Sequence, residues 1–401
     1  MIKMKIHGRF KFHNVGQGLF YSGRLENTND PENPEFFSFV YDCGAVPSTD
    51  SLTSEIDSFK NSLPSPGSSG EKTLNLLVIS HLHDDHVNGL ERLLDGVKVD
   101  TVVMPYLNEG LKSLPLLEST EEDKFLSELY NDEVAWFASR GVRRIIRLVA
   151  EDMRLENEAD HIDQSIIADE SEIEVESERV LRTERSNGIS IIYLKSHSTA
   201  KCSRFCWEFH FENLKLDSVW IDIYKRIVRD HSDKHGSLEK ILKSKLLTKA
   251  LMKDIRKTPC KDILNRTSVI LLHCPEEKVA TAWFGCCKRH LCSYCMTKCG
   301  EHSFCNSVLT GDVALENGEH FEILDEALAR HESYVLQFPH HGAKNDRNID
   351  YFSAFHANAT VLSYGIGNKY KHPRTEVVYR LDRPVLVNEK QSFEYRIFVR
   401  R

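Results

Sequence analysis

Residues 78–89 read VISHLHDDHVNG and overlap the apolar run LNLLVI at 74–79. The apolar run is typical of a buried β-strand, and four potential metal ligands follow its end: His81, His83, Asp85 and His86. In extended backbone, residues two apart point the same way, so His81 and His83 can reach one ion together. Where the chain turns toward a helix, Asp85 and His86 can face a second ion beside the first. We therefore expect a two-metal site at this strand end.

The ligand types restrict the metal and its chemistry. Imidazole and carboxylate groups suit zinc, manganese or iron, and an incomplete shell of protein ligands leaves room for a bridging water. Two such ions would lower the pKa of that water, so that hydroxide forms near neutral pH and attacks a substrate. A polar loop that merely contains three histidines is a poor alternative, because solubility does not require four ligands after a buried strand. We expect two divalent ions, zinc or manganese, with Asp85 also acting as a catalytic residue.

Two later segments can complete this site. The strand SVLTGD at 307–312 ends in Asp312, and functional groups of open α/β sheets gather at strand carboxyl ends, so Asp312 is a candidate bridge between the ions. The segment FPHHGAKN at 338–345 offers His340 and His341 before Gly342, which permits a tight turn. Adjacent side chains in extended backbone point to opposite faces, so we expect one of the two to bind metal and favour His341.

Strand and helix patterns alternate along most of the chain. Residues 1–46 predict an opening β-meander, broken by Gly16, Gly18 and the turn NTNDPENP at 27–34. Strands are predicted at 101–106 and 142–149 with a helix from Glu121 to Arg140 between them. Further strands are expected at 268–273, 307–312, 334–338, 360–365 and 393–399, with helices near 321–331 and 348–355. This order predicts an α/β fold without internal repeats.

The composition excludes some classes of protein. The chain has 401 residues and a net charge of −8, which argues against a protein that coats nucleic acid non-specifically. Its apolar runs are far shorter than the roughly 20 residues that span a bilayer, and the N-terminus lacks the apolar core of a signal peptide. Eleven cysteines without such a signal favour reduced thiols or metal ligation in the cytoplasm over disulfides.

With these residues in place, the chain resembles the metallo-β-lactamase superfamily, whose H-x-H-x-D-H signature is met in full at 81–86. More narrowly, it is similar to the soluble metallo-hydrolase domain of ComEC-type competence proteins. This narrower likeness lies in NVGQG at 14–18, N-x-x-S at 265–268 ahead of TGD at 310–312, PHHG at 339–342, and G-x-G-N-x-Y-x-H-P at 365–373. The resemblance implies a four-layer αββα sandwich and nuclease or phosphodiesterase activity. It also implies that Asp42 supports the site by hydrogen bonding and does not bind metal.

The sequence differs from the family pattern at three positions, and the family pattern suggests further site residues. The family usually has Asp at Asn14, Gly at Asn88 and often Ser at Ala343, so substrate contacts are expected to differ. Many superfamily members supply a third histidine to the first ion, and His197 is the candidate here, although a plain loop residue is the alternative. We expect four further site residues with these roles: metal ligation by His197, ligation or proton donation by His372, and substrate contacts by Lys344 and Asn368.

Three insertions interrupt the single hydrolase domain that we predict over residues 1–401, at about 151–187, 215–260 and 275–306. The first is acidic, with thirteen Asp and Glu against four Arg over 151–185, and reads as a solvated edge. The second carries a basic amphipathic helix at 238–257 whose lysines are either a solvated face or a contact for phosphates. The third contains six of the seven cysteines found from Cys274 to Cys305 and predicts a structural zinc site, with unliganded thiols as the alternative. The candidate zinc ligands there are Cys287, Cys292, Cys295, Cys299 and Cys305.

Three functions follow as expectations. The first is a nuclease or phosphodiesterase acting on DNA or RNA. The second is a hydrolase of a small molecule such as a thioester, lactam or cyclic nucleotide, which the same metal chemistry would support. The third is a partner-dependent subunit without activity of its own. Because the competence proteins carry membrane segments and this chain has none, we expect a freestanding cytoplasmic enzyme. The resemblance to standalone relatives further implies protein partners in a multi-component prokaryotic antiviral defence system.

Overall fold

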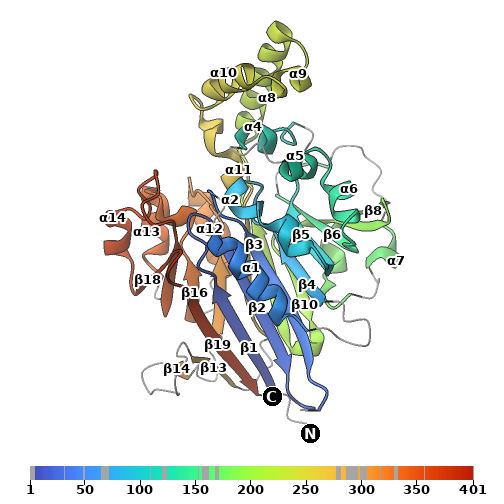
Figure 1. The fold of residues 1–401 in the computed structure, drawn as a ribbon, viewed down its shortest axis with the longest axis vertical. Coiled ribbons are helices and arrows are strands. Elements are labelled where there is room, and N and C mark those ends of the chain that lie inside the picture. The colour runs from blue at the N-terminus through green and yellow to red at the C-terminus, as the bar shows by residue number, and fades with distance from the viewer. Residues whose placement is uncertain are drawn as a thin grey trace.

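The computed structural model describes residues 5–30, 32–47, 50–64, 72–108, 110–119, 124–151, 153–155, 162–167, 171–276, 281–285, 297–298, 305–316, 318–328, 333–355 and 357–400. These residues build two large β-sheets with helices on the outer face of each (Figure 1). Among the described helices, none is long and apolar enough to cross a lipid bilayer.

The first sheet has eleven strands in the order β14-β13-β19-β1-β2-β3-β4-β5-β6-β9-β8. The predicted meander forms its antiparallel start, and β3, β4, β5, β6 and β9 then run parallel to one another. The strands are β1 (Lys5–Phe12), β2 (Phe20–Asn27), β3 (Glu35–Cys43), β4 (Lys72–Val78), β5 (Val97–Pro105), β6 (Arg144–Val149), β8 (Val180–Ser186), β9 (Ile189–Lys195), β13 (Thr281–Gly285), β14 (Thr297–Lys298) and β19 (Phe393–Arg400).

The second sheet has eight strands in the order β18-β17-β16-β15-β12-β11-β10-β7. Its strands β15, β16, β17 and β18 are parallel, whereas β10, β11 and β12 pair antiparallel. The strands are β7 (Glu174–Val175), β10 (Ser198–Cys202), β11 (Trp207–Asn213), β12 (Val269–Pro275), β15 (Cys305–Leu309), β16 (Ser333–Gln337), β17 (Ala359–Ser363) and β18 (Pro384–Val387).

Alternating burial on the strands produces three apolar layers. In β4, Leu76 and Val78 face the other sheet, where they join a core with residues such as Phe209 and Leu271. Leu77 packs instead beneath the helices of the first sheet. Those helices are α1 (Asp50–Ser62), α3 (Leu90–Leu94), α4 (Leu114–Glu118), α5 (Lys124–Asn131) and α6 (Glu133–Ala138).

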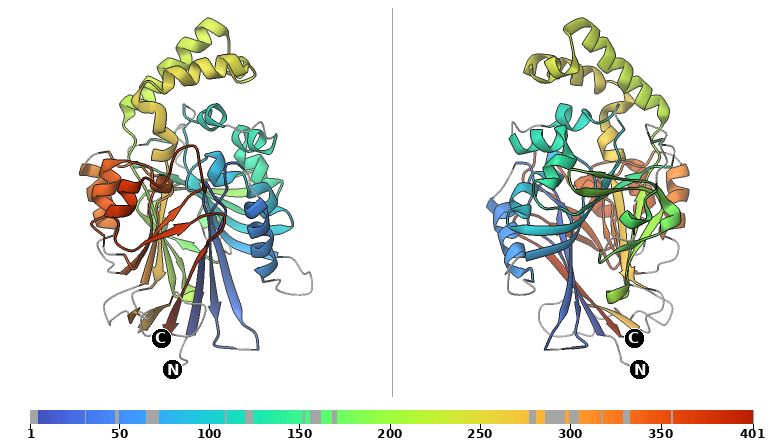
Figure 2. Two further views of the ribbon diagram at one scale, coloured as in Figure 1. Left: turned by 60° about the vertical axis from the view of Figure 1, so that its left-hand side comes forward. Right: turned by 90° about the vertical axis from the view of Figure 1, so that its right-hand side faces the viewer.

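A third apolar cluster lies outside the second sheet, under α12 (Gly318–Leu328), α13 (Asp346–Phe352) and α14 (Thr375–Arg380). The layers are therefore helix, sheet, sheet and helix, as the two turned views show (Figure 2). The predicted four-layer αββα fold class is confirmed.

The basic insertion forms α8 (Ser218–His235), α9 (Leu238–Leu242) and α10 (Lys245–Ile255), which project from the end of the sandwich where the short α2 (Asp84–Val87) lies (Figures 1 and 2). The single helix predicted at 238–257 is wrong, because Ser244 ends one helix and caps the next by accepting a hydrogen bond from the amide of Leu247. Leu246 consequently leaves the apolar stripe and is 78% exposed. We call α8–α10 the basic arm; α11 (Ile263–Arg266) follows it and leads into β12.

The other two insertions are described only in part. The acidic insertion contributes α7 (Gln164–Ile167), β7 and β8, and the last two strands lie at sheet edges, in keeping with the predicted solvated edge. The helix predicted from Glu121 to Arg140 is broken at Asp132, whose carboxylate caps α6. The zinc ligands predicted at Cys287, Cys292, Cys295 and Cys299 lie outside the described residues, as does the side chain of Cys305.

Candidate metal-binding site

The signature segment lies where the carboxyl ends of the parallel strands meet. β4 ends before His81, and the chain enters α2 at Asp84. Two glycines let the backbone of α2 approach the end of β3 closely: a Cβ on Gly18 would lie 2.6 Å from the carbonyl oxygen of Asp85, and one on Gly44 would lie 2.7 Å from the amide nitrogen of His86. Gly18 also has a φ of 155°. Part of the NVGQG motif is thus explained by close backbone packing against the signature.

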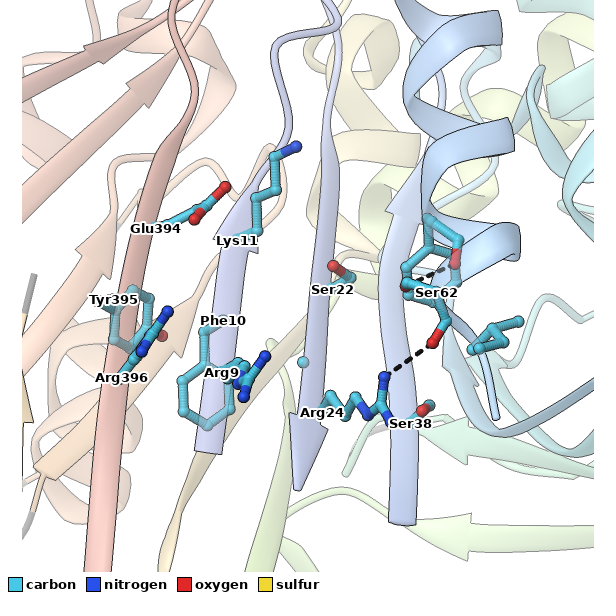
Figure 3. A pocket seen from close by; sticks show the side chains of 13 residues that line it. Arg9, Phe10, Lys11, Ser22, Arg24, Ser38, Ser62, Glu394, Tyr395 and Arg396 are labelled. Carbon is cyan, nitrogen blue, oxygen red and sulfur yellow. Dashed lines mark hydrogen bonds between the residues drawn. The ribbon is translucent and has the colours of Figure 1, made fainter. Parts of the chain in front are cut away.

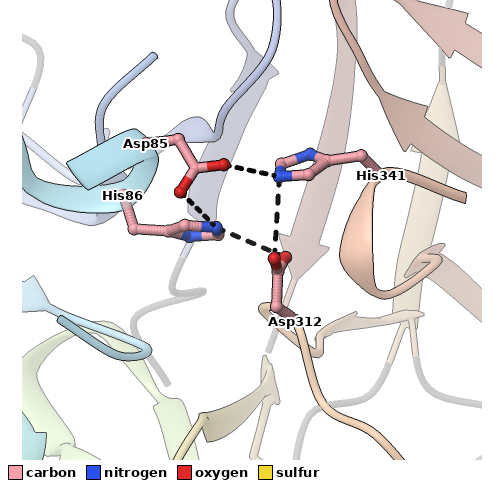
Figure 4. Close-up of side chains that lie close together, drawn as sticks. All are labelled: Asp85, His86, Asp312 and His341. Atoms are coloured by element: carbon pink, nitrogen blue, oxygen red, sulfur yellow. Dashed lines mark hydrogen bonds and ion pairs between the residues drawn. The ribbon is translucent and has the colours of Figure 1, made fainter. Parts of the chain in front are cut away.

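Four side chains from three distant segments converge beside α2 (Figure 4). His86 Nε2 lies 3.3 Å from Asp312 Oδ1, and His341 Nε2 lies 3.2 Å from Asp85 Oδ2. The other two distances between neighbouring ligand atoms are longer: 3.9 Å from His86 Nε2 to Asp85 Oδ1 and 3.7 Å from His341 Nε2 to Asp312 Oδ2. We call Asp85, His86, Asp312 and His341 the four-ligand cluster. The structure therefore brings together four of the predicted ligands, including the histidine that the sequence favoured in PHHG.

The histidines of the cluster are held by their other ring nitrogen. His86 Nδ1 lies 2.8 Å from Oδ2 of the fully buried Asp42, which also accepts hydrogen bonds from the amide and hydroxyl of Ser80. His341 Nδ1 lies 2.9 Å from the carbonyl oxygen of Ser363. Both contacts fix the ring so that Nε2 faces the cluster, which is the usual support for a metal-binding histidine. Asp42 occupies the supporting position that the resemblance implied.

The cluster fits a divalent cation. His86 Nε2 and Asp312 Oδ1 are both buried and face each other at 3.3 Å without forming a hydrogen bond, an arrangement that suits two ligands of one cation. Ligands bound to one ion at ~2.1 Å in tetrahedral geometry lie ~3.4 Å apart, close to the spacings in the cluster. Burial opposes protonation of His86, but Asp312, Asp42 and Asp85 hold its pKa well above its ordinary value. The surrounding carboxylates therefore stabilise positive charge at this point.

The carboxylates of the cluster carry the charge that such a cation requires. Burial opposes ionisation of Asp312, but the nearby His341 and His86 hold the pKa of this carboxyl well below its ordinary value. The pKa of Asp85 is likewise lowered: burial raises it, but nearby groups, most strongly His86, outweigh that effect. Ionised carboxylates are the form that binds metal.

His81 and His83 form a pair next to the cluster. His81 Nε2 lies 2.9 Å from His83 Nδ1, and the ring of His81 lies 4.2 Å from that of His86. His83 Nε2 contacts the Glu118 carboxylate of α4 at 2.7 Å. Burial lowers the pKa of His83, but Glu118 outweighs this effect and the net shift is upward. The two histidines predicted to share one ion therefore lie together, directly beside the cluster.

His340 lies beside Asp312, and His372 lies beside His340. His340 Nε2 is 3.8 Å from Asp312 Oδ2, and its ring is 5.7 Å from that of His372. Burial lowers the pKa of His372 to about 4, with contributions from His340 and His341. The imidazole is therefore neutral near pH 7, which disfavours the predicted role as proton donor and is compatible with the predicted role as ligand.

Three other predicted site residues are placed differently from the cluster. His197 contacts Glu212 at 2.9 Å and is not brought to the four ligands, so its placement does not support the predicted role as third histidine. Asn368 uses its amide within its own loop, donating to the carbonyl oxygens of Gly365 and His372 and accepting from the amide of His372, so it braces the loop. Lys344 is exposed.

Two departures from the family pattern have structural uses. Asn88 accepts a hydrogen bond from the amide of Ala45 and donates one to its carbonyl oxygen, and so holds α2 against the end of β3. Asn14 donates to the carbonyl oxygen of Glu389. Neither amide is directed at the cluster through these contacts.

Sequence reasoning missed Glu118 and Asp84. The Asp84 carboxylate accepts hydrogen bonds from Ser119 and Tyr130, which tie α2 to the segment containing α4 and α5. The only sequence signal for Asp84 was its place inside the signature. Glu118 had none, because its contact with His83 depends on how the α4 segment folds back over the strand ends.

A separate basic cavity of about 240 Å³ lies on the outer face of the first sheet, between α1 and the strands β19, β1 and β2 (Figure 3). Arg396, Arg9 and Arg24 are direct partners across these three strands, so three guanidinium groups share one row. Ser62 at the end of α1 accepts a hydrogen bond from Arg24 through its carbonyl oxygen. None of the residues predicted for the metal site lines this cavity.

No family model and no curated protein matches the sequence. Among solved structures, the long form of RNase Z from yeast is similar over 97% of this chain, with 10% identity and a TM-score of 0.34. The chain spans 41% of the length of that protein. The metallo-β-lactamase fold protein YhfI from Bacillus subtilis is similar over 97% of this chain and 99% of its own length, with 9% identity and a TM-score of 0.38. At these scores and identities, neither similarity bears on the activity of this chain.

Proposed function

We propose that the chain is a metal-dependent hydrolase that cleaves phosphodiester bonds in DNA or RNA. The observation that carries the proposal is the four-ligand cluster, in which two carboxylates and two imidazoles converge and the buried His86 Nε2 and Asp312 Oδ1 face each other without a hydrogen bond. The pair His81 and His83 lies beside it at the spacing of the signature. Such a centre, when loaded with two divalent ions, supplies an activated water and stabilises negative charge on the substrate.

The protein's own groups have distinct parts in this proposal. Asp42 orients His86, and the Ser363 carbonyl orients His341, so neither imidazole needs to reorganise during the reaction. Asp85 is 22% exposed while the rest of the cluster is buried, so it is the ligand on the substrate side. His372 is neutral and partly buried, with its ring 5.7 Å from that of His340, and is a candidate for further ligation.

The basic arm supports a polyanionic substrate. Residues 218–257 contain eleven Lys and Arg against five Asp and Glu, although the whole chain has a net charge of −8. The arm stands on the α4 segment, because Tyr224 lies 3.0 Å from the Ser113 hydroxyl and Lys225 packs over Gly110. At its other end, α11 leads to Ser268, whose hydroxyl lies 3.4 Å from His81 Nδ1. The arm therefore joins the sandwich at the strand ends that carry the metal ligands, and its lysines offer contacts for the phosphates of a polymer bound there.

The experiment is cleavage of labelled single- and double-stranded DNA and RNA by purified protein supplied in turn with zinc, manganese and magnesium. Asp85→Ala removes a cluster ligand and should abolish cleavage. Asp84→Asn is the matched control, because Asp84 is adjacent in sequence but bonded to Ser119 and Tyr130, and it should retain cleavage. Wild-type protein that binds one ion at the cluster and one beside His81 and His83 yet cuts none of the polymers would overturn the nuclease proposal.

A small-molecule hydrolase is the second candidate, and the acidic net charge favours it. Salt separates the two, because phosphate contacts release counterions and make polymer binding fall steeply with salt concentration, whereas binding of a small neutral substrate does not. From the ComEC-type likeness we also retain the proposal that the enzyme works with protein partners in prokaryotic antiviral defence. Co-purification from a phage-infected host would test that role.

A further inference from the structure

We propose that Glu208, His210 and Cys274 form a second zinc site, on the outer face of the second sheet and separate from the four-ligand cluster. The three ligand atoms lie within 4.8 Å of one another. Carboxylate, imidazole and thiolate are the three groups that zinc takes in proteins. The proposal goes beyond the hydrolase function and does not depend on it.

The sheet register places the three side chains on one face. Glu208 and Cys274 are direct partners across β11 and β12, so their side chains stand side by side. His210 is two residues along the same strand from Glu208 and therefore points the same way. The residues between and beside them in β11, Trp207 and Phe209, belong to the core between the sheets, which leaves the three candidate ligands on the outer face.

The distances match ligands of one ion. His210 Nε2 lies 3.4 Å from Glu208 Oε2 and 3.8 Å from Cys274 Sγ. In a tetrahedral zinc site, bonds of ~2.0–2.1 Å to nitrogen or oxygen and ~2.3 Å to sulfur give edges of ~3.3 Å between nitrogen and oxygen and ~3.6 Å between nitrogen and sulfur. A small inward adjustment of Cys274 would complete three corners, and water could take the fourth.

The arrangement does not fit a Cys-His-Glu nucleophile. In such a triad the acid contacts one ring nitrogen and the cysteine the other, so that the histidine relays a proton. Here Glu208 and Cys274 both face Nε2, while Nδ1 lies 3.0 Å from the hydroxyl of Thr199 on β10. Convergence of three donors on one point is the geometry of ligands, and Thr199 is the partner that orients the imidazole.

The site would clip β11 to β12 at the sheet end remote from the cluster. β12 begins next to Ser80, since the amide of Val269 donates to the Ser80 carbonyl oxygen. Cys274 lies five residues farther along the strand, roughly 17 Å at ~3.3 Å per residue. The ion would therefore secure the end of β12, where the chain leaves the second sheet.

The test is zinc content of the full-length protein, measured by mass spectrometry of metals after purification with zinc and gel filtration. Because the cluster and the cysteine-rich insertion can also bind zinc, each variant is compared with wild type prepared in parallel. Cys274→Ser and His210→Gln should each lose one equivalent of zinc per chain. Cys202→Ser is the matched control, since it removes a buried thiol of β10 in the core between the sheets and should lose none.

Two outcomes would overturn the proposal. One is unchanged zinc content in His210→Gln, whose partly exposed side chain can be replaced without opening the core. The other is loss of zinc in His210→Gln without loss in Cys274→Ser, which would assign the imidazole to a site that excludes Cys274. Asp312→Asn keeps the two sites distinct, because it should remove zinc from the cluster while the further loss caused by His210→Gln persists in the double variant.

Discussion

Asp42 illustrates how a residue that touches no substrate can control the candidate centre. Its buried carboxylate holds both the end of β4, through Ser80, and the ring of His86. It has a left-handed φ of 55°, which asparagine also tolerates, so Asp42→Asn keeps the backbone while removing the charge. We expect zinc affinity of the cluster to fall about 10–100-fold. Competition with a chromophoric chelator measures this, and an affinity equal to that of wild type would contradict the assigned role.

His273 provides a pH-dependent contribution to stability. It lies between the sheets among aromatic rings, 2.7 Å from the Tyr21 hydroxyl, and burial lowers its pKa to about 3. Because the unfolded chain takes up this proton near pH 6.5 and the folded chain does not, the contribution is fully present above pH 6.5 and is lost as pH falls toward 3. Between pH 7.5 and 5.0 the loss should be about 2 kcal/mol.

His273→Phe should therefore flatten the decline in unfolding free energy between pH 7.5 and 5.0, whatever it does to stability at pH 7.5. Urea unfolding at both pH values measures the decline, and His235→Gln at the end of α8 is the control. If the unfolding free energy of His273→Phe declined as steeply as that of wild type, the pH dependence would come from other titratable groups.

At the scale of elements, the row Arg396, Arg9 and Arg24 places like charges directly opposite one another on β19, β1 and β2. Such pairs destabilise a sheet by a few tenths of a kcal/mol to about 1 kcal/mol, and salt screens them. Arg396→Gln should therefore raise the unfolding free energy by about 0.5 kcal/mol at low ionic strength. The gain should shrink in 0.5 M salt; a gain independent of salt would point to packing and not to charge.

The basic arm carries the prediction about polymer binding. Lys249 and Lys253 are exposed and four residues apart, so they share one face of α10. Reversing both to glutamate should weaken nucleic-acid binding and reduce the slope of log affinity against log salt by about one per lost phosphate contact. Lys98→Glu, at the start of β5 and thus at the opposite strand end, is the control. Equal binding curves for the double variant and wild type would remove the arm from the proposal.

Sequence patterns predicted the strands better than the helices. The strand positions agree with the structure to within a few residues, because period-two burial and apolar runs are local signals. Two predicted long helices were each broken in two, at Asp132 and Ser244, where a capping side chain bonds to the amide three residues on. Both breaks had a visible signal, since Asp and Ser favour the start of a helix over its interior.

At the scale of the whole molecule, the candidate site depends on contacts across more than half of the chain. His81, His83, Asp85 and His86 could be found because a single segment displays them, and Asp312 and His341 because both follow strands of the parallel sheet. The contacts of His83 with Glu118 and of His197 with Glu212 could not be found, since they depend on how loops from different strands pack.

The central claim is that the four-ligand cluster and the adjacent histidine pair hold divalent metal. The most direct measurement is anomalous diffraction at the zinc edge from crystals of the zinc-loaded protein. We predict one anomalous peak bounded by Asp85, His86, Asp312 and His341, and a second beside His81 and His83. Crystals that show no peak within bonding distance of the four-ligand cluster would contradict the account.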